Sequence, residues 1–282
     1  MPARGEPAAH TAVASFPEIR RGDAVPPSDQ SMPARSEPAA HTAVASFSDV
    51  RHGDAVLPSD RDFLRRIASE VPSAEPNHVM LYGHGAPPSL ALSDDTQRLL
   101  ALARTLVARF DADALLLSVR LLVAPPGFAA QGWHLDYRAF DSLNARTLFA
   151  ALTPCTRENC TELLLPANAA RLERDVAEQL LRDRLVVDVA PSDVSERPLL
   201  LDEFAVCVVP TSRLPHRRGP TVAAGHTRVV LNVDFTTCSP AKLAAIGFVD
   251  DDAVSAAEGT FVGRDVVDDL HSEVVVRVVD QG

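Results

Sequence analysis

A change of periodicity near residue 115 constrains the fold of this chain more than any other feature of its sequence. Before it, apolar residues recur at helical spacing over 62–71, and a second helix is predicted after Ser93, with Leu99, Leu102 and Leu106 on one face. After it, apolar residues form short strand-like runs separated by turn signals. These runs lie at Leu115–Val123, Gly132–Tyr137, Arg146–Leu152, Thr161–Leu165, Leu185–Val189, Phe204–Val209, Arg228–Phe235 and Val274–Val279.

Helical patterns are few in the second part of the chain. A long one begins at Asn168, with Leu172, Val176 and Leu180 as its apolar stripe, and Ser239-Pro240 begins a short one. Parallel strand–helix–strand repetition is absent, as are glycine-rich loops of the GxxxxGK and GxGxxG types. Two helices followed by many short strands are typical of a sandwich or barrel. We therefore predict a mainly β fold with flanking helices and a double-stranded β-helix core, the jelly roll of cupin-like proteins.

The first 60 residues differ from the rest in being a tandem repeat. The segment that begins at Met1 returns at Met32, and both copies contain EPAAHTAVASF. Two copies are fewer than the three that a solenoid needs, and the repeat shows no sustained helical or strand period. We expect residues 1–60 to be a disordered N-terminal extension, with a docking peptide as the alternative, and residues 61–282 to form the double-stranded β-helix domain.

Composition narrows the classes of protein further. The formal net charge of -11 disfavours a dedicated nucleic-acid binder, although an enzyme acting on nucleic acid stays open. No apolar run approaches the roughly 20 residues of a membrane helix, and the first 30 residues lack a signal-peptide core, so we expect a cytoplasmic protein. Cys155 and Cys160 are close enough for a zinc clip or a disulfide, but four cysteines in all favour free thiols.

The sharpest local motif is the run Gly132–Tyr137, which reads GWHLDY. In an extended strand, residues i and i+2 point to the same side, so His134 and Asp136 can aim an imidazole and a carboxylate at one point. Two such ligands and one distant histidine make the 2-His-1-carboxylate facial triad of non-haem Fe(II) oxygenases. Asp136 and His134 are therefore candidate metal ligands.

Two other places in the sequence carry a similar tripeptide. His52-Gly53-Asp54 lies in the repeated segment, whose other copy has Arg21 in place of His52. We expect no packed surroundings there to hold a metal ligand in place. His271-Ser272-Glu273 is the glutamate form, but no histidine follows it. Context therefore favours His134.

The third ligand has two candidates, His216 and His226. His216 follows a strand-like run, and Arg228 comes about a dozen residues later in the next strand. An arginine at the mouth of a barrel can hold a carboxylate through two parallel hydrogen bonds. At the same distance beyond His226 the sequence has Cys238, and no basic residue occurs before Lys242. We predict that His216 is the ligand and that His226 is a neighbouring residue.

The order of strand, HxD, strand, distal histidine and arginine resembles the Fe(II)- and 2-oxoglutarate-dependent dioxygenases, and most closely the phytanoyl-CoA dioxygenase-like group. The resemblance covers about residues 114–237 and includes a proline-terminated strand, Leu163-Leu164-Leu165-Pro166. The chain departs from that group at Cys160, where a glycine is usual, and at Ala167-Asn168-Ala169, where glycine-serine-histidine is usual.

The resemblance implies a role for each residue of the motif. His134, Asp136 and His216 would bind Fe(II), and the distal carboxylate of 2-oxoglutarate would pair with Arg228. With O2 as the second cosubstrate, the reaction would hydroxylate a small molecule and release succinate and CO2. Because the carboxylate of Asp136 is present, the resemblance favours hydroxylation over halogenation.

Substrate contacts and the overall function have competing interpretations. Trp133, Tyr137 and Arg138 flank the motif as candidate substrate-pocket residues, with core packing of the rings and a solvated arginine as the alternatives. A cupin-like metal-binding protein would need the histidines but not Arg228. A degenerate oxygenase fold used as a binding module is a third hypothesis. We expect no membrane partner, and nucleic acid and protein substrates stay open beside a small molecule.

Overall fold

The computed structural model describes residues 49–71, 77–82, 93–136, 144–166, 186–221, 225–238 and 274–279. The chain divides into two compact units, Met1–Ala40 and His41–Gly282, and every described residue belongs to the second. The predicted N-terminal extension therefore lies largely outside the described residues. Among the residues described, no helix is long and apolar enough to cross a membrane.

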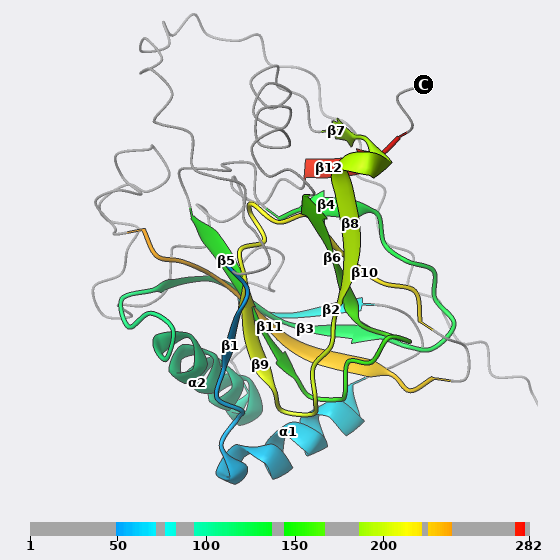
Figure 1. Ribbon diagram of the computed structural model, residues 1–282. Helices are drawn as coiled ribbons and strands as arrows, with labels where there is room; N and C mark the ends of the chain where they lie inside the picture. The colour runs from blue at the N-terminus through cyan, green and yellow to red at the C-terminus, as the bar shows by residue number, and fades with distance from the viewer. Residues whose placement is uncertain are drawn as a thin grey trace, which may run out of the picture. The chain divides into compact units, whose positions relative to one another are not determined.

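The first of two sheets has the strand order β1-β9-β5-β11-β3-β2, and all its strand pairs are antiparallel (Figure 1). Its strands are β1 (Arg51–Gly53), β2 (Asn77–Tyr82), β3 (Leu115–Ala124), β5 (Ala145–Ala151), β9 (Val206–Val209) and β11 (Arg228–Thr236). The long strands β3 and β11 pair along their whole length, with a register shift between Asp234 and Phe235. The candidate functional site lies against this sheet.

The second sheet has the order β7-β12-β4-β10-β6-β8. Its strands are β4 (Trp133–Leu135), β6 (Thr161–Pro166), β7 (Val186–Val189), β8 (Val194–Leu199), β10 (His216–Arg218) and β12 (Val274–Val278). All its pairs are antiparallel except β12 with β7. From β3 to β6, and again from β9 to β11, consecutive strands alternate between the two sheets. This alternation makes the fold a double-stranded β-helix, as predicted from the sequence.

Two helices cover the outer face of the first sheet (Figure 1). They are α1 (Pro58–Glu70) and α2 (Asp94–Ala108), and a 3-10 turn lies at Pro191–Asp193. The Ser93 side chain accepts a hydrogen bond from the Thr96 N–H, which confirms the predicted N-cap of α2. Apolar residues of both helices pack against Val229, Leu231 and Val233 of β11. Since side chains alternate along a strand, Arg228, Val230, Asn232 and Asp234 face the second sheet.

The space between the sheets is partly apolar and partly polar. One core cluster joins Phe149 and Val230 of the first sheet to Leu163 of the second, with Leu214 and the thiol of Cys207 beside them. The polar residues on the same inner face of the first sheet are Ser118, Arg120, Thr147, Arg228, Asn232 and Asp234, all buried. Burying so many polar groups costs free energy unless they are paired, so this stripe marks a functional region.

The predicted strands appear in the structure with ends shifted by up to a few residues. Four strands were not predicted, namely β1, β2, β8 and β10. The packed part of the chain begins before residue 61, because β1 pairs with β9 and Val56 is buried. The helical patterns expected from Asn168 and from Ser239 lie outside the described residues.

Candidate metal centre

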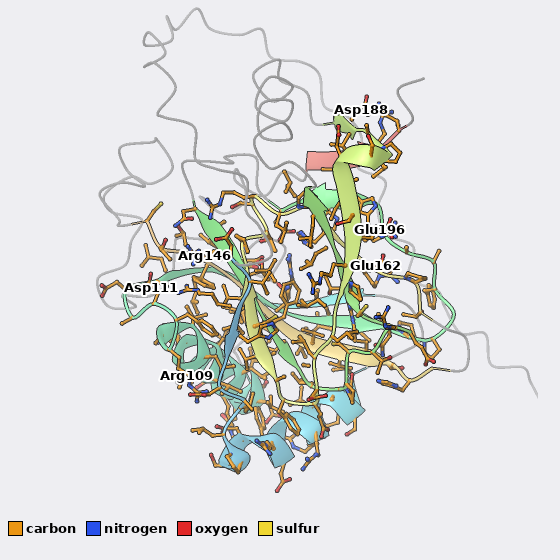
Figure 2. The ribbon with its side chains drawn as sticks, viewed as in Figure 1. Arg109, Asp111, Arg146, Glu162, Asp188 and Glu196 are labelled. Atoms are coloured by element: carbon orange, nitrogen blue, oxygen red, sulfur yellow. The ribbon has the colours of Figure 1, made fainter. Side chains whose placement is uncertain are left out.

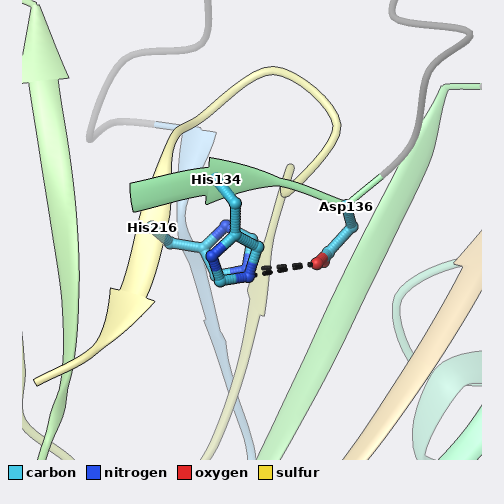
Figure 3. A group of neighbouring side chains, drawn as sticks. All are labelled: His134, Asp136 and His216. Carbon is cyan, nitrogen blue, oxygen red and sulfur yellow. Dashed lines mark ion pairs between the residues drawn. The ribbon is translucent and has the colours of Figure 1, made fainter. Parts of the chain in front are cut away.

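His134 and His216 meet across two neighbouring strands of the second sheet. The two residues are register partners in the antiparallel pair of β4 and β10. Their rings point into the space between the sheets, with centroids 4.5 Å apart and planes inclined by 54°. Both residues are buried. Two histidines that are far apart in the sequence are thus held side by side by backbone pairing (Figure 3).

Hydrogen bonds of the same kind orient both imidazole rings. The Nδ1 atom of His134 lies 2.9 Å from the carbonyl oxygen of Gly132, and that of His216 lies 3.2 Å from the carbonyl oxygen of Leu214. A carbonyl can only accept, so Nδ1 of each ring carries the hydrogen. This leaves Nε2 directed at the interior, and such hydrogen bonds are what commonly fix the tautomer of metal-binding histidines.

Asp136 completes the cluster directly after β4. Its Oδ1 atom lies 3.7 Å from Nε2 of His134 and 3.4 Å from Nε2 of His216 (Figure 3). One ligand atom from each of the three residues lies within 4.8 Å of the other two. The backbone N–H of Asp136 donates to the carbonyl of Thr211, which fixes the chain where it leaves the strand. In the described part of the chain, this is the one group of three such side chains that could hold a metal ion.

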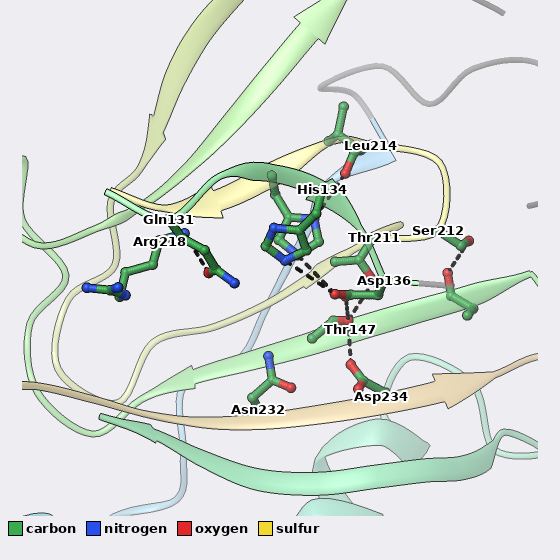
Figure 4. A network of polar contacts seen from close by, with 12 residues as sticks. Gln131, His134, Asp136, Thr147, Thr211, Ser212, Leu214, Arg218, Asn232 and Asp234 are labelled. Atoms are coloured by element: carbon green, nitrogen blue, oxygen red, sulfur yellow. Dashed lines mark hydrogen bonds and ion pairs between the residues drawn. The ribbon is translucent and has the colours of Figure 1, made fainter. Parts of the chain in front are cut away.

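A buried polar network supports the carboxylate of Asp136 from the side of the first sheet (Figure 4). The Thr147 hydroxyl lies 3.3 Å from Asp136 Oδ2, 2.6 Å from Asp234 Oδ1 and 2.6 Å from the Thr211 hydroxyl. Asp234 also accepts a hydrogen bond of 2.6 Å from Ser118. The network connects the cluster to Asp234 of β11, so hydrogen bonds link the carboxylate of Asp136 to the first sheet.

Arg120 balances the charge of this network. Its guanidinium lies 3.2 Å from Asp234 Oδ2, and its Nε donates to Asn232 Oδ1 at 2.9 Å. Both Arg120 and Asp234 are almost fully buried. A buried carboxylate and a buried guanidinium are tolerated together because each offsets the desolvation of the other.

The charges of the site shift the pKa values of its members. Burial by itself would raise the pKa of Asp136, but the positive charge and hydrogen bond of His216, with His134 and Arg120, hold that pKa well below its usual value. Burial would lower the pKa of His216, but the neighbouring Asp136 carboxylate outweighs it and raises that pKa. The site therefore favours an ionised carboxylate facing cationic or metal-bound partners.

Arg228 lies at the start of β11 with its guanidinium buried in the same interior. Its NH1 group donates to the Thr161 hydroxyl at 3.1 Å, and its Nε has no hydrogen-bond partner. Among the described residues, no carboxylate forms an ion pair with Arg228. Burial lowers its pKa, as expected for a cation without a counter-ion. Such a group is costly in isolation, and an anionic ligand would satisfy it.

Two further predicted residues, Trp133 and His226, lie apart from the three converging ligands. Trp133 lies on β4 next to His134, so it points to the opposite face, where the Arg217 guanidinium covers its ring at 4.1 Å. Trp133 is buried at that face. Tyr137 and Arg138 lie outside the described residues. His226 is exposed, and its Nε2 lies 3.0 Å from the carbonyl of Pro154, away from the three converging ligands.

Outside the cluster, two expectations concern His52 and the cysteines. His52 is exposed, as expected for a residue that is not a ligand, but it lies in the paired strand β1 and not in an unpacked segment. All four cysteines are buried, and none of them forms a disulfide. Burial raises the pKa of the Cys155 thiol to about 11.

Sequence comparison identifies no relatives: no family model matches the chain, and no curated protein matches it. Solved structures do match. AviO1 from Streptomyces viridochromogenes Tue57 is 17% identical with a TM-score of 0.44, covering 67% of this chain and 90% of its own. The non-heme alpha ketoglutarate dependent carbocyclase SnoK from nogalamycin biosynthesis is 14% identical with a TM-score of 0.44, covering 66% and 79%.

A third match is EvdO2 from Micromonospora carbonacea var. aurantiaca, complexed with 2-oxoglutarate. It is 15% identical with a TM-score of 0.42, covering 67% of this chain and 86% of its own. Likenesses at this level carry no information on the chemistry of this chain, because one fold hosts many functions.

Proposed function

We propose that this protein is an Fe(II)- and 2-oxoglutarate-dependent oxygenase that hydroxylates a small molecule, with release of succinate and CO2. The observation that supports it best is the convergence of His134, Asp136 and His216 inside the double-stranded β-helix. We also propose the phytanoyl-CoA dioxygenase-like group within that superfamily, because the order of the motifs resembles it most closely.

The donor set fits Fe(II). Two neutral imidazole nitrogens and one carboxylate oxygen form the facial triad, which leaves three positions of an octahedral ion open for other ligands. His134, Asp136 and His216 would hold the ion. Bound there together with 2-oxoglutarate and O2, iron would supply an oxidant able to remove a hydrogen atom from the substrate. Asp136 supplies the carboxylate that favours hydroxylation over halogenation.

The protein's own contribution is to fix the ligands before the metal arrives. The carbonyl groups of Gly132 and Leu214 hold both Nδ1 atoms, so each Nε2 already faces the centre. Thr147 and the Thr211 carbonyl fix Asp136 from two sides. Such partners of ligand side chains commonly change metal affinity by about 10- to 100-fold.

Arg228 is the residue that we assign to the distal carboxylate of 2-oxoglutarate. Its guanidinium is buried and lacks an ion-pair partner within the described residues, so a carboxylate would satisfy its unpaired Nε. The adjoining Thr161 hydroxyl supplies a second polar contact. A cupin-like protein that binds only a metal would need the histidines but not Arg228.

Turnover of 2-oxoglutarate in the variant Arg228→Ala tests the proposal. Purified protein with Fe(II) should release succinate, and Arg228→Ala should lower affinity for 2-oxoglutarate by at least about tenfold, since a charge-assisted contact is lost. Affinity for Fe(II) should be nearly unchanged. Arg65→Ala, which removes an exposed arginine on α1, is the matched control. Equal affinity for 2-oxoglutarate in the wild type and Arg228→Ala would refute the role of Arg228.

A further inference from the structure

Arg218 is a second arginine on the inner face of the barrel. It follows His216 by two positions on β10, so the two side chains lie on the same face of that strand. Its register partner across the antiparallel pair with β6 is Thr161. The intervening Arg217 points the other way and forms ion pairs with Glu162 and Glu196. These two glutamates lie close together in Figure 2, on the neighbouring strands β6 and β8.

Thr161 is a neighbour of both Arg218 and Arg228. Arg218 faces Thr161 across the strand pair, and Arg228 NH1 donates to the Thr161 hydroxyl at 3.1 Å. The two arginines belong to different sheets, and Thr161 neighbours Arg218 through strand register and Arg228 through a hydrogen bond. Beside the larger effect of burial, the positive charge of Arg218 also lowers the pKa of Arg228, as expected for two close cations.

Arg228 and Arg218 each have a buried N–H group that makes no hydrogen bond. These groups are Nε of Arg228 and NH1 of Arg218, and neither has a hydrogen-bond partner. In the part of the chain that the structure describes, no carboxylate pairs with either guanidinium. Arg120 and Arg217, in contrast, form ion pairs with Asp234 and Glu162. Two neighbouring cations without a counter-ion indicate a place built for an anion.

The backbone of Arg218 is held firmly enough for this role. Its carbonyl accepts a hydrogen bond of 2.9 Å from the Gln131 N–H, and its own N–H donates to the Gln131 side chain at 3.5 Å. Figure 4 shows the Gln131 side chain on the histidine side of Arg218. The next residue, Gly219, donates its N–H to the Cys160 carbonyl at 3.0 Å. The backbone around Arg218 is therefore hydrogen-bonded on one side to Gln131, just before β4, and on the other to Cys160, just before β6.

We propose that Arg218, Arg228 and the Thr161 hydroxyl form one anion site that binds the distal carboxylate of 2-oxoglutarate between two guanidinium groups. This inference rests on the function proposed above. Since the Thr161 oxygen accepts from Arg228, its own hydrogen stays available to a carboxylate oxygen. Arg218 is in this view a second cosubstrate-binding residue, and two cations select a 2-oxo acid that carries a distal carboxylate over one that lacks it.

A comparison of two 2-oxo acids tests this inference. Anaerobic protein loaded with Fe(II) is titrated with 2-oxoglutarate and with 2-oxopentanoate, which keeps the chelating end but has no distal carboxylate. The proteins are wild type, Arg218→Gln, Arg218→Lys and the control Arg65→Ala. Arg218→Gln should weaken 2-oxoglutarate binding by at least about tenfold and change 2-oxopentanoate binding less than about twofold. Arg218→Lys should fall between wild type and Arg218→Gln, because the charge stays and the forked geometry is lost.

Each other outcome refutes a specific statement. Unchanged affinity of Arg218→Gln for 2-oxoglutarate overturns the inference and leaves Arg218 to a different ligand. Equal weakening of both acids, together with weaker iron binding, shows that the substitution disturbs His216 and also overturns it. Failure of the iron-loaded wild type to bind 2-oxoglutarate refutes the proposed function itself. Circular dichroism and thermal unfolding establish that every variant is folded before it is titrated.

Discussion

His134 and His216 are direct register partners across the antiparallel pair of β4 and β10. Backbone hydrogen bonds between short strands thus decide whether the two imidazoles meet. The spacing of their rings, 4.5 Å between centroids, follows from strand pairing and from the two carbonyl groups that hold the Nδ1 atoms. Anything that shifts β10 against its neighbours should therefore weaken metal binding.

Gly219, directly after β10, gives the first prediction. A Cβ atom at this position would lie 2.9 Å from the Cys160 backbone oxygen and 3.2 Å from a side-chain carbon of Glu162. Gly219→Ala should displace β10 from β6, lower the free energy of unfolding by about 1–3 kcal/mol and weaken Fe(II) binding through His216. Urea unfolding and equilibrium dialysis with Fe(II) measure the two effects.

Gly132 provides the matched control for this substitution. It lies two residues before His134, but a Cβ atom there would meet nothing within 4 Å. Gly132→Ala should leave both stability and iron affinity near the wild-type values, because its carbonyl still accepts from His134. Equal losses in the two alanine variants would contradict the role assigned to the contact between Gly219 and β6.

Thr147 gives the second prediction. Its hydroxyl connects Asp136 to Asp234, and both carboxylates are buried. Thr147→Val keeps the shape of the side chain but removes these hydrogen bonds, so iron affinity should fall roughly 10- to 100-fold. Thr147→Ser keeps the hydroxyl and should restore most of that affinity. Similar iron affinities for the valine and serine variants would show that the hydroxyl does not orient Asp136.

The ion pair of Arg120 with Asp234 gives the third prediction. Asp234→Asn leaves a buried guanidinium without its counter-ion, so the free energy of unfolding should fall by about 3–5 kcal/mol. The double substitution Arg120→Met/Asp234→Leu removes both charges and should recover much of that loss. Chemical denaturation measures all three proteins. A double variant less stable than Asp234→Asn would mean that the pair itself, and not the unpaired charge, dominates stability.

Cys155 gives a prediction on pH. Burial raises the pKa of its thiol from 9.0 to about 11, so the folded state keeps its proton after the unfolded chain has lost it. The thiol should therefore contribute stability below pH 9 that is progressively lost between pH 9 and pH 11, by up to roughly 3 kcal/mol. Urea unfolding across this range should show a shallower fall for Cys155→Ala. An identical slope in both proteins would exclude this contribution.

Much of the fold could be predicted from local patterns in the sequence. Short apolar runs and turn signals identify most of the long strands, and Ser93 identifies the start of α2, because these signals act within a few residues. β10 has only three residues and β8 contains Pro198 among polar residues, so neither carries a readable pattern. Their places are set by pairing with distant strands, which a single sequence does not display.

Part of the candidate site could also be predicted from local patterns in the sequence. His134 and Asp136 are two positions apart on one strand, so their convergence follows from strand geometry alone. His216 and Arg228 were chosen by their order and spacing, and the structure brings both to the interior. Arg218 was missed, because Arg217-Arg218 looks like a charged turn in the sequence. Only the pairing of Arg218 with Thr161, and of Arg217 with Glu162, shows that Arg218 points inward and Arg217 outward.

The central claim is that His134, Asp136 and His216 hold an iron ion to which 2-oxoglutarate can bind. An anaerobic titration with Fe(II) and then 2-oxoglutarate, followed by visible absorption, tests it most directly. We predict a weak metal-to-ligand charge-transfer band in the wild type and none in the folded double variant His134→Ala/His216→Ala. A folded, iron-loaded wild-type protein that shows no such band would contradict the claim.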